Sequence, residues 1–374
     1  MHLCTQQMVT ARHHTKAPSG RTHVRLGGTV ALAFAVLGVP TIFGDLFSHN
    51  SAQQSHSGIV TVPSPSIADA RAVLWSEPTD IERRDLFYGP GGKEHQPHGS
   101  FTFLREDLDG SHPKFEVQDD DGVHWKAKLG TEARPETVAS RLLWAVGFSA
   151  DEDYFVDEIR VNHMPAHVHR GQRMIDSNGT MHSVRLKRES DERVKVGAWS
   201  WRQNPFAGTR ELNGLRVLMA VINNWDLKDI NNTVFELKHA HEEGANERVY
   251  EVRDLGSSFG SAGLERTDRS NGDLRAYRST PFITHLTSDE VEFNVPRRPD
   301  WIVLANAPEF FRRLQLLWLG RHIPRADAKW AGLLLSSLAP NQIRDAFRAA
   351  GYSPDAVEGF TTVLEARLTQ LSEL

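Results

Sequence analysis

The chain has 374 residues, which is enough for one large domain or for two lobes that each bury a core. Its net charge of −5 provides no general positive field, so we expect no nucleic-acid partner. Cys4 is the only cysteine, which excludes an intramolecular disulfide and a metal site built from several thiolates.

The N-terminal region divides into three segments before the globular part begins. Residues 1–25 form a basic tail, residues 26–44 a hydrophobic anchor or signal segment, and residues 45–66 a linker rich in Ser, Gln, His and Pro. The apolar run fits a membrane span or a signal-peptide core, so an uncleaved anchor, a cleaved signal and a buried segment all stay open. Because a basic flank stays in the cytoplasm, we expect the globular part to be membrane-anchored or secreted on the extracytoplasmic side.

Residues 67–190 are predicted to form a strand-rich N-lobe, which starts with a short helix at residues 68–75. Strand patterns recur at residues 101–105, 114–118, 123–129, 154–161 and 181–187. In the third of these strands, Lys126 and Lys128 lie on one face, since side chains alternate along a strand. A helix follows that strand and carries Glu136 in its first turn.

Residues 191–374 are predicted to form a mostly helical C-lobe with catalytic and metal loops. Its first helix, at residues 209–223, leads into Asn-Asn-Trp-Asp-Leu-Lys-Asp-Ile-Asn-Asn, and a strand at residues 249–253 leads into Val-Arg-Asp-Leu-Gly. Four more helices are predicted at residues 310–319, 328–338, 341–350 and 355–371. This order of strands and helices indicates an α+β fold of two lobes.

Two acidic motifs follow the first helix and the strand of this C-lobe. In the first motif, Asp226 precedes Asn231 by five residues, and in the second, Asp254 stands directly before Leu255 and Gly256. A protein-kinase fold uses this order to hold a base beside a metal-bound nucleotide. Either motif alone is more often an ordinary acidic turn, so the prediction depends on both motifs together with the upstream lysine strand and glutamate.

Phosphoryl transfer needs cations beside the phosphates, ligands for a metal and a base that orients the incoming hydroxyl. We expect Asp226 to be the base. Asn231 and Asp254 would hold Mg²⁺, which prefers oxygen ligands. Lys128 or Lys126 would contact the phosphates of ATP, with Lys128 favoured because it lies at the end of its strand.

Two further groups complete this candidate nucleotide site. Glu136 would pair with the chosen lysine and hold it in place. The hairpin loop at residues 109–114 would close over the phosphates through its backbone amides, with Gly110, Ser111 and Lys114 contacting the nucleotide.

These motifs resemble those of the atypical kinases, which include HipA-type kinases, phosphatidylinositol 3/4-kinases and the secretory-pathway Golgi casein kinases. The resemblance covers residues 100–260. The matching positions are Gly110-x-x-Pro113-Lys114, Trp125-Lys126-Ala127-Lys128, residues 135–143, Asp226, Asn231 and Asp254. It implies a two-lobed protein-kinase-like fold that binds ATP and Mg²⁺. The chain lacks the Arg-His that follows the catalytic aspartate in lipid kinases, and no substrate class carries over.

The preferred interpretation is an ATP-dependent phosphotransferase that acts on a hydroxyl of a protein or a small molecule. The alternative is a pseudokinase or ligand-binding module with the same cleft, because an extracytoplasmic compartment of a bacterium holds little ATP. A third interpretation is a metal protein that uses His163, His167 and His169, although solvated histidines near a loop are the more common case. Residues 89–93 lack the spacing of a phosphate-binding loop and are interpreted as a turn.

Overall fold

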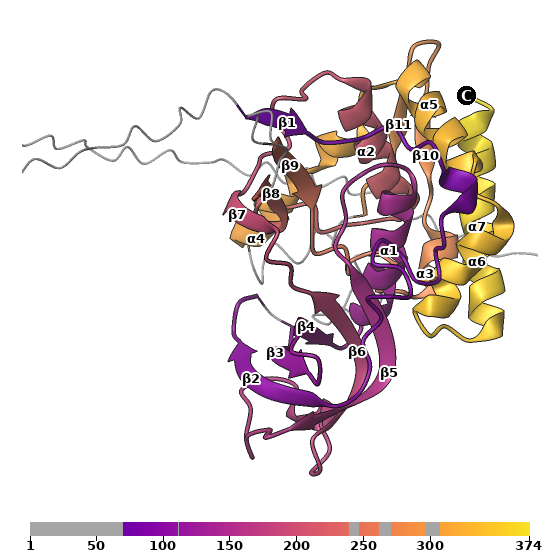
Figure 1. Cartoon of the computed structure of the whole chain (residues 1–374). Helices are drawn as coiled ribbons and strands as arrows, with labels where there is room; N and C mark the ends of the chain where they lie inside the picture. Colours follow the sequence, from indigo (N-terminus) through magenta and orange to yellow (C-terminus); the bar gives the residue numbers. More distant parts are fainter. Residues whose placement is uncertain (1–69, 111, 239–246, 262–270, 297–306) are drawn as a thin grey trace, which may run out of the picture. The chain divides into compact units, whose positions relative to one another are not determined.

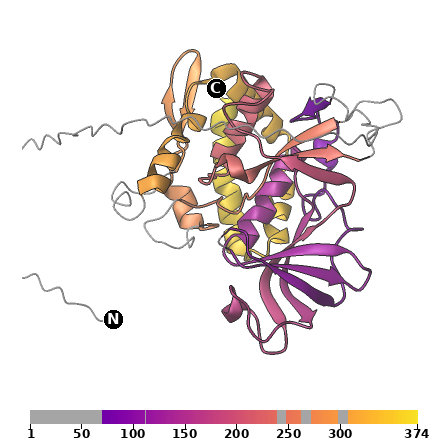
Figure 2. The same cartoon turned by 90° about the vertical axis from the view of Figure 1, so that its left-hand side faces the viewer.

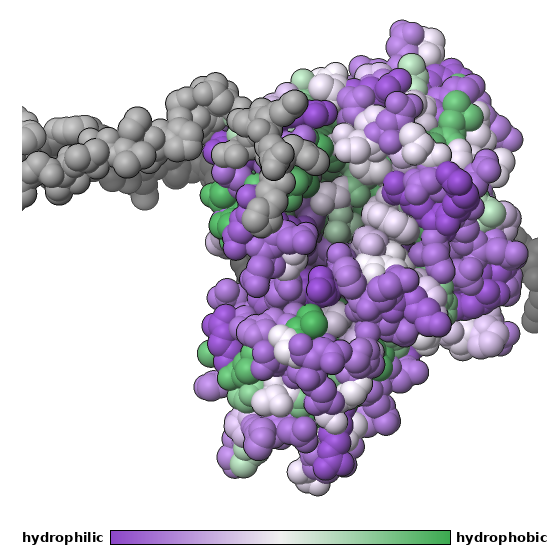
Figure 3. Space-filling model, viewed as in Figure 1, coloured by the Kyte–Doolittle hydropathy of each residue, from purple (hydrophilic) through white to green (hydrophobic). Residues whose placement is uncertain are grey.

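The computed structural model describes residues 70–110, 112–238, 247–261, 271–296 and 307–374, all of which belong to one compact unit, Pro63–Leu374. The apolar segment at residues 26–44 and the linker at residues 45–66 lie outside these residues. Within the described part of the chain, no helix is both long and apolar enough to cross a membrane. The face shown in Figure 3 is mostly hydrophilic, and its hydrophobic residues lie in small separate patches.

A closed barrel of five strands forms the first part of the fold (Figures 1 and 2). The strands are β2 (Phe101–Asp107), β3 (Lys114–Asp119), β4 (His124–Leu129), β5 (Asp153–Asn162) and β6 (Thr180–Arg188). Their order around the barrel is β2-β3-β4-β6-β5, and a short parallel pairing of β2 with β5 closes it. Apolar residues that alternate along each strand fill the interior, among them Phe115, Trp125 and Leu186. The five predicted strands are confirmed, but their closure into a barrel was not predicted.

Helix α1 (Ala133–Ala145) connects the barrel with the helices that follow, because it packs against β5 and β6 on one side and against α6 on the other. Its Val138, Leu142 and Leu143 belong to the larger hydrophobic core of the molecule. Since α1 is buried on most of its surface, its first turn is held firmly beside the end of β4.

A second sheet has the order β1-β9-β8-β7. Its strands are β1 (Arg71–Val73), β7 (Arg193–Gly197), β8 (Asn232–Leu237) and β9 (Glu247–Val252). The short helix predicted at residues 68–75 is wrong, because residues 71–73 are a strand that pairs in parallel with β9. The apolar residues that suggested a helix contribute instead to the larger core, where Leu74 is buried.

The helical part packs around a cluster of aromatic side chains. Its helices are α2 (Arg210–Val221), α3 (Leu274–Ser279), α4 (Ala307–Leu314), α5 (Arg325–Ser336), α6 (Pro340–Ala349) and α7 (Pro354–Ser372). Phe259, Phe347 and Phe360 lie in mutual ring contact and are almost fully buried. The four predicted C-terminal helices are confirmed, except that the first ends early at Leu314.

Several elements were not predicted. They are β8 and α3 described above, the 3-10 helices η2 (Ile81–Arg83), η3 (Gln172–Met174), η4 (Asp229–Asn231) and η6 (Leu317–Gly320), and a small sheet of β10 (Ile283–Leu286), β11 (Glu290–Phe293) and β12 (Ile323–Pro324). Of these, η4 begins three residues after Asp226 and ends with Asn231. The α+β class is confirmed by the barrel and the helices together.

Candidate functional site

Lys128 lies at the centre of a buried cluster of charges, near the end of β4. Its ammonium Nζ lies 2.9 Å from Glu136 Oε2 and 2.7 Å from Asp254 Oδ1. A third carboxylate, that of Glu132, lies 2.6 Å away. Burial lowers the pKa of Lys128, but the three carboxylates outweigh this effect and raise the pKa well above its ordinary value. The side chain is therefore a fixed cation at neutral pH.

Lys126 takes no part in this cluster, although it lies on the same strand. Its ammonium lies 3.1 Å from Asp107 and 3.8 Å from Glu116, toward the β2–β3 side of the barrel. Of the two lysines that the sequence left open, Lys128 is the one that contacts Glu136 and Asp254.

Glu136 is held in the first turn of α1 by two cations. One carboxylate oxygen contacts Lys128, and the other accepts a hydrogen bond of 2.5 Å from Arg185 of β6. Burial raises the pKa of Glu136, but Arg185 and Lys128 outweigh it and hold the pKa below its ordinary value. Arg185 lies opposite Lys128 in the β4–β6 register. Sequence reasoning missed Arg185, because the pairing of these two strands is not apparent from their order in the chain.

Asp254 follows β9 in the left-handed backbone region, with φ of 57°. Residues other than glycine rarely adopt this conformation, and such strain collects at functional sites. Lys128 lowers the pKa of Asp254 below its ordinary value and outweighs the opposing effect of burial. Its side chain keeps 45% of its surface exposed, whereas Glu132 and Glu136 keep 6% each. Asp254 is thus the most accessible of the three carboxylates around Lys128.

Backbone hydrogen bonds join the two acidic motifs to each other. β8 and β9 form an antiparallel hairpin, so the start of β8 lies beside the end of β9. Arg253 N donates to Asn231 O at 2.9 Å just before Asp254, and Trp225 N donates to Ser257 O at 3.1 Å just after it. The loop that carries Asp226 and Asn231 is therefore fixed on both sides of Asp254.

Within this loop, the backbone folds back on itself. Asn231 Nδ2 donates to Asp226 O at 2.8 Å, and Asp226 N donates to Asn224 Oδ1 at 2.9 Å. The Asp226 carboxylate is 14% exposed and its Oδ1 lies 3.2 Å from Lys228 Nζ. Lys228 had no predicted role, yet it contacts the candidate base.

The loop between β2 and β3 supplies the other predicted nucleotide contacts. Ser111 lies outside the described residues. Lys114 lies opposite Lys128 in the β3–β4 register, and its ammonium is 3.7 Å from Asp107. Burial lowers the pKa of Lys114, and the neighbouring Lys128 adds to the effect. The side chains of Lys114 and Lys128 therefore lie on the same face of the sheet.

Gly110 turns the same loop with φ of 69°, a conformation that glycine adopts without strain. Its carbonyl accepts a hydrogen bond from the guanidinium of Arg170. The same guanidinium donates to Asp107 O at 2.9 Å, and Arg170 N donates to Glu106 Oε1 at 2.9 Å. Arg170 thus ties the loop to the segment between β5 and η3, a role that no local motif indicated.

Glu132 stands directly before α1 and enters the site without any signal in the sequence. Its Oε1 lies 3.0 Å from His112 Nε2 and accepts a hydrogen bond of 3.2 Å from Ser257 Oγ. Gly256 makes this approach possible, because a Cβ atom built there would lie 2.4 Å from Glu132 Cβ. The glycine of the second acidic motif therefore allows the segment after Asp254 to pack against the start of α1.

Replacing this glycine should disturb the site. We expect Gly256→Ala to lower the free energy of unfolding by about 1–3 kcal/mol, because Glu132 must move away from Lys128 to admit the methyl group. Urea unfolding of the full-length chain measures the change. Gly197→Ala is the control, since a Cβ there meets nothing within 4 Å. An equal loss in both variants would contradict this packing role.

The donor set around Lys128 fits a hard divalent cation. Carboxylate oxygens of Glu132, Glu136 and Asp254 all lie within 4.8 Å of one another. These three carboxylates outnumber the two permanent cations that contact them, Lys128 and Arg185, so the cluster has room for further positive charge. Oxygen ligands are those that Mg²⁺ prefers, and the partly exposed Asp254 is the accessible one.

The histidines of the third interpretation do not gather around a metal-like centre. His169 Nδ1 lies 3.0 Å from Glu106, and His163 and His167 are exposed. The group of potential metal ligands found in the described part of the chain contains carboxylates alone. Residues 89–93 form turns, as predicted, and Gly92 O accepts a hydrogen bond from Tyr154.

No protein-family model and no curated protein matches this sequence. Among solved structures, the chain is similar to CtkA, a proinflammatory kinase of Helicobacter pylori, with a TM-score of 0.40 and 12% sequence identity. The match covers 74% of this chain and 98% of that one. A likeness this distant says nothing about what the present chain binds or transfers.

Proposed function

We propose that this chain is an atypical kinase, which transfers the γ-phosphoryl group of ATP to a hydroxyl group with the help of Mg²⁺. One observation carries the proposal: Lys128 contacts both Glu136 of α1 and Asp254 after β9. A lysine held by a helix glutamate beside a metal-binding aspartate is the arrangement that phosphoryl transfer requires in kinases. Folding brings these groups together from segments that are more than a hundred residues apart.

In this proposal, each group of the site has a separate task. Lys128, fixed by Glu136, would contact the α- and β-phosphates of ATP and orient them. Asp226 would accept a hydrogen bond from the substrate hydroxyl and take up its proton as the bond to phosphorus forms. Its Oδ1 lies 3.2 Å from Lys228 Nζ, and this contact helps to hold the carboxylate in place for that task.

Asp254 and Asn231 are the residues that would hold Mg²⁺. The Asn231 amide nitrogen donates to Asp226 O, which leaves the amide oxygen as its ligand atom. When bound, the ion neutralises charge on the phosphates. Because the β8–β9 hairpin and the Arg253–Asn231 bond fix both residues, little ordering of the protein is needed on binding.

The decisive test is whether Asp254 is needed for metal-dependent nucleotide binding. For the full-length wild-type chain, we expect ATP with Mg²⁺ to raise the melting temperature, because a ligand that binds the folded state stabilises it. Asp254→Asn should abolish this rise, since it removes the charged ligand while keeping the shape of the side chain. Asp191→Asn, at an exposed turn before β7, is the matched control and should keep the rise.

The outcomes separate the interpretations. A rise in melting temperature that survives Asp254→Asn would overturn the assigned metal site. Binding of ATP and Mg²⁺ without any hydrolysis or autophosphorylation would identify a pseudokinase or binding module. No rise in the wild-type chain, with either Mg²⁺ or Mn²⁺, would contradict the kinase proposal itself.

A further inference from the structure

A cavity lies directly beside the loop that carries the candidate base. It has a volume of about 460 Å³, and three of its lining residues, Lys228, Asp229 and Ile230, stand between Asp226 and Asn231 in the sequence. Cavities of this size are typical of sites for small organic molecules. A molecule bound there would lie against the segment that holds Asp226.

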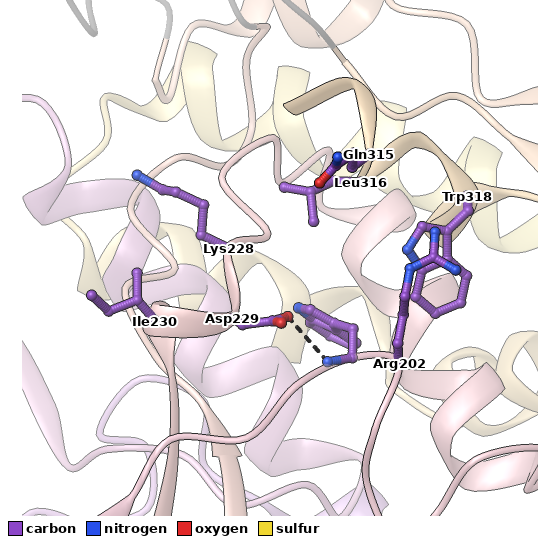
Figure 4. Close-up of a pocket in the computed structure, with 8 residues that line it drawn as sticks. Arg202, Lys228, Asp229, Ile230, Gln315, Leu316 and Trp318 are labelled. Carbon is purple, nitrogen blue, oxygen red and sulfur yellow. Dashed lines mark hydrogen bonds between the residues drawn. The ribbon is translucent and has the colours of Figure 1, made fainter. Parts of the chain in front are cut away.

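Apolar side chains line part of the cavity, and the cationic side chain of Arg202 lies on one side of it (Figure 4). Figure 4 shows Arg202 beside Trp318 on one side and Ile230 on the opposite side, with Leu316 above them. Lys228 extends away from Arg202, and its ammonium contacts Asp226 instead. Both Arg202 and Lys228 line the cavity, and Arg202 is the one whose side chain is not paired with Asp226. Ile230, which is 78% exposed, offers apolar surface within the loop that carries Asp226.

Arg202 is held by stacking and not by a carboxylate. Its guanidinium lies 4.5 Å from the centre of the Trp318 ring. Within the described residues, no acidic side chain pairs with this guanidinium. A guanidinium that stacks on an aromatic face keeps its N–H groups at the edge, where they match the two oxygens of a carboxylate or phosphate. Arg202 therefore provides a ready site for an anion.

The wall behind Arg202 is rigid, so the cavity is already formed without a ligand. The guanidinium of the buried Arg216 donates to Trp318 O at 3.1 Å and to Leu319 O at 3.0 Å, which ties η6 to α2. Opposite, Asp229 accepts a hydrogen bond of 3.1 Å from Trp201 N, which ties the catalytic loop to the Trp201 segment. Fixed walls reduce the entropy that binding costs.

We infer that this cavity binds the phosphoryl acceptor, and that the acceptor is a small molecule with a hydroxyl, an apolar body and an anionic group. The inference rests on the proposed kinase function and names its substrate class. The anionic group would pair with Arg202, the apolar body would lie against Ile230 and Leu316, and the hydroxyl would reach Asp226. The hydroxyl oxygen then forms its bond to the γ-phosphorus of ATP, the bond from that phosphorus to the β–γ bridging oxygen breaks, and ADP leaves with the electron pair. The hydroxyl proton passes to Asp226.

Binding of a small probe to the full-length chain tests this inference. The probe is p-coumarate, a planar hydroxylated acid, and methyl p-coumarate is its neutral counterpart. We expect p-coumarate to bind in the millimolar range, as a fragment of this size should, when measured by calorimetry without nucleotide. The methyl ester should bind at least about tenfold more weakly, because it cannot form a charged pair with Arg202.

Two variants and two matched controls locate the binding. Arg202→Gln should remove the preference for the acid, whereas Arg210→Gln should keep it, since Arg210 also stacks on a tryptophan, at 4.7 Å, but lies outside the cavity. Ile230→Asp should weaken binding of both probes, whereas Leu333→Asp, a change at an exposed apolar residue outside the cavity, should not.

Three results would overturn the inference: no saturable binding of p-coumarate, equal binding of acid and ester, or equal effects of the Arg202 and Arg210 variants. Because these measurements contain no nucleotide, they fail or succeed independently of the Mg²⁺-dependent ATP binding that tests the kinase proposal. If p-coumarate binds at the cavity but ATP does not bind, the cavity is an anion-binding site and the kinase proposal is wrong.

Discussion

Lys128→Met should destabilise the folded chain by about 3 kcal/mol, the lower end of the loss expected when one partner of a buried ion pair is removed. The variant leaves Glu132, Glu136 and Asp254 without their shared cation. The loss stays at the lower end because Glu136 keeps Arg185, and Asp254 is partly exposed to water. Urea unfolding at neutral pH measures it.

The control is Lys126→Met, on the same face of the same strand. Its ammonium pairs with Asp107 while 28% exposed, so its removal should cost less than about 1 kcal/mol. Similar losses in the two variants would contradict a central role for Lys128. This comparison also decides which of the two lysines the site depends on, a choice that the sequence alone left open.

The loss in Lys128→Met should also depend on pH. In the wild-type fold, the pKa values of Asp254, Glu132 and Glu136 are lower than their ordinary values of 3.8, 4.5 and 4.5. A lowered carboxyl pKa stabilises the fold above the ordinary pKa, and this contribution disappears as the pH falls through the lowered value. The difference between wild type and variant should therefore be largest near pH 7 and shrink below about pH 4.

Local patterns were sufficient to predict most of the individual elements. Alternation around Trp125 and Phe115 marks strands, because one face of each fills the barrel, and Thr209 caps α2 as a helix-starting residue should. Partners distant in the chain were not predictable in this way. Residues 71–73 are a strand only because β9 lies beside them, and no feature of their own sequence indicates that pairing.

The residues of the candidate site show the same contrast between local patterns and distant partners. Spacing within the acidic motifs marked Asp226, Asn231 and Asp254, and the order of the elements along the chain added Lys128 and Glu136. Arg185 and Glu132 were missed, because each joins the site only through packing of β6 and the start of α1 around Lys128. Such residues become visible once the register of the barrel is known.

Asp226→Asn should lower the rate of phosphoryl transfer by about 10²–10⁴-fold, the usual contribution of a positioned base. The amide has the shape of the carboxylate but cannot take up a proton, and it still reaches Lys228. The turnover of ATP by the full-length chain, with water or the chain itself as acceptor, measures the loss. The rise in melting temperature with ATP and Mg²⁺ should be retained, because Asp254 and Asn231 are unchanged.

Asp229→Asn provides the matched comparison for the base, since this residue lies in the same loop. Its carboxylate accepts a hydrogen bond from Trp201 N, a contact that holds the loop in place. If Asp226 is the base, its variant should lose far more activity than Asp229→Asn while binding the nucleotide equally well. Equal losses would mean that both variants act through the shape of the loop. Full activity in Asp226→Asn would remove Asp226 from the mechanism, because no step that needs its proton affinity would then limit the reaction.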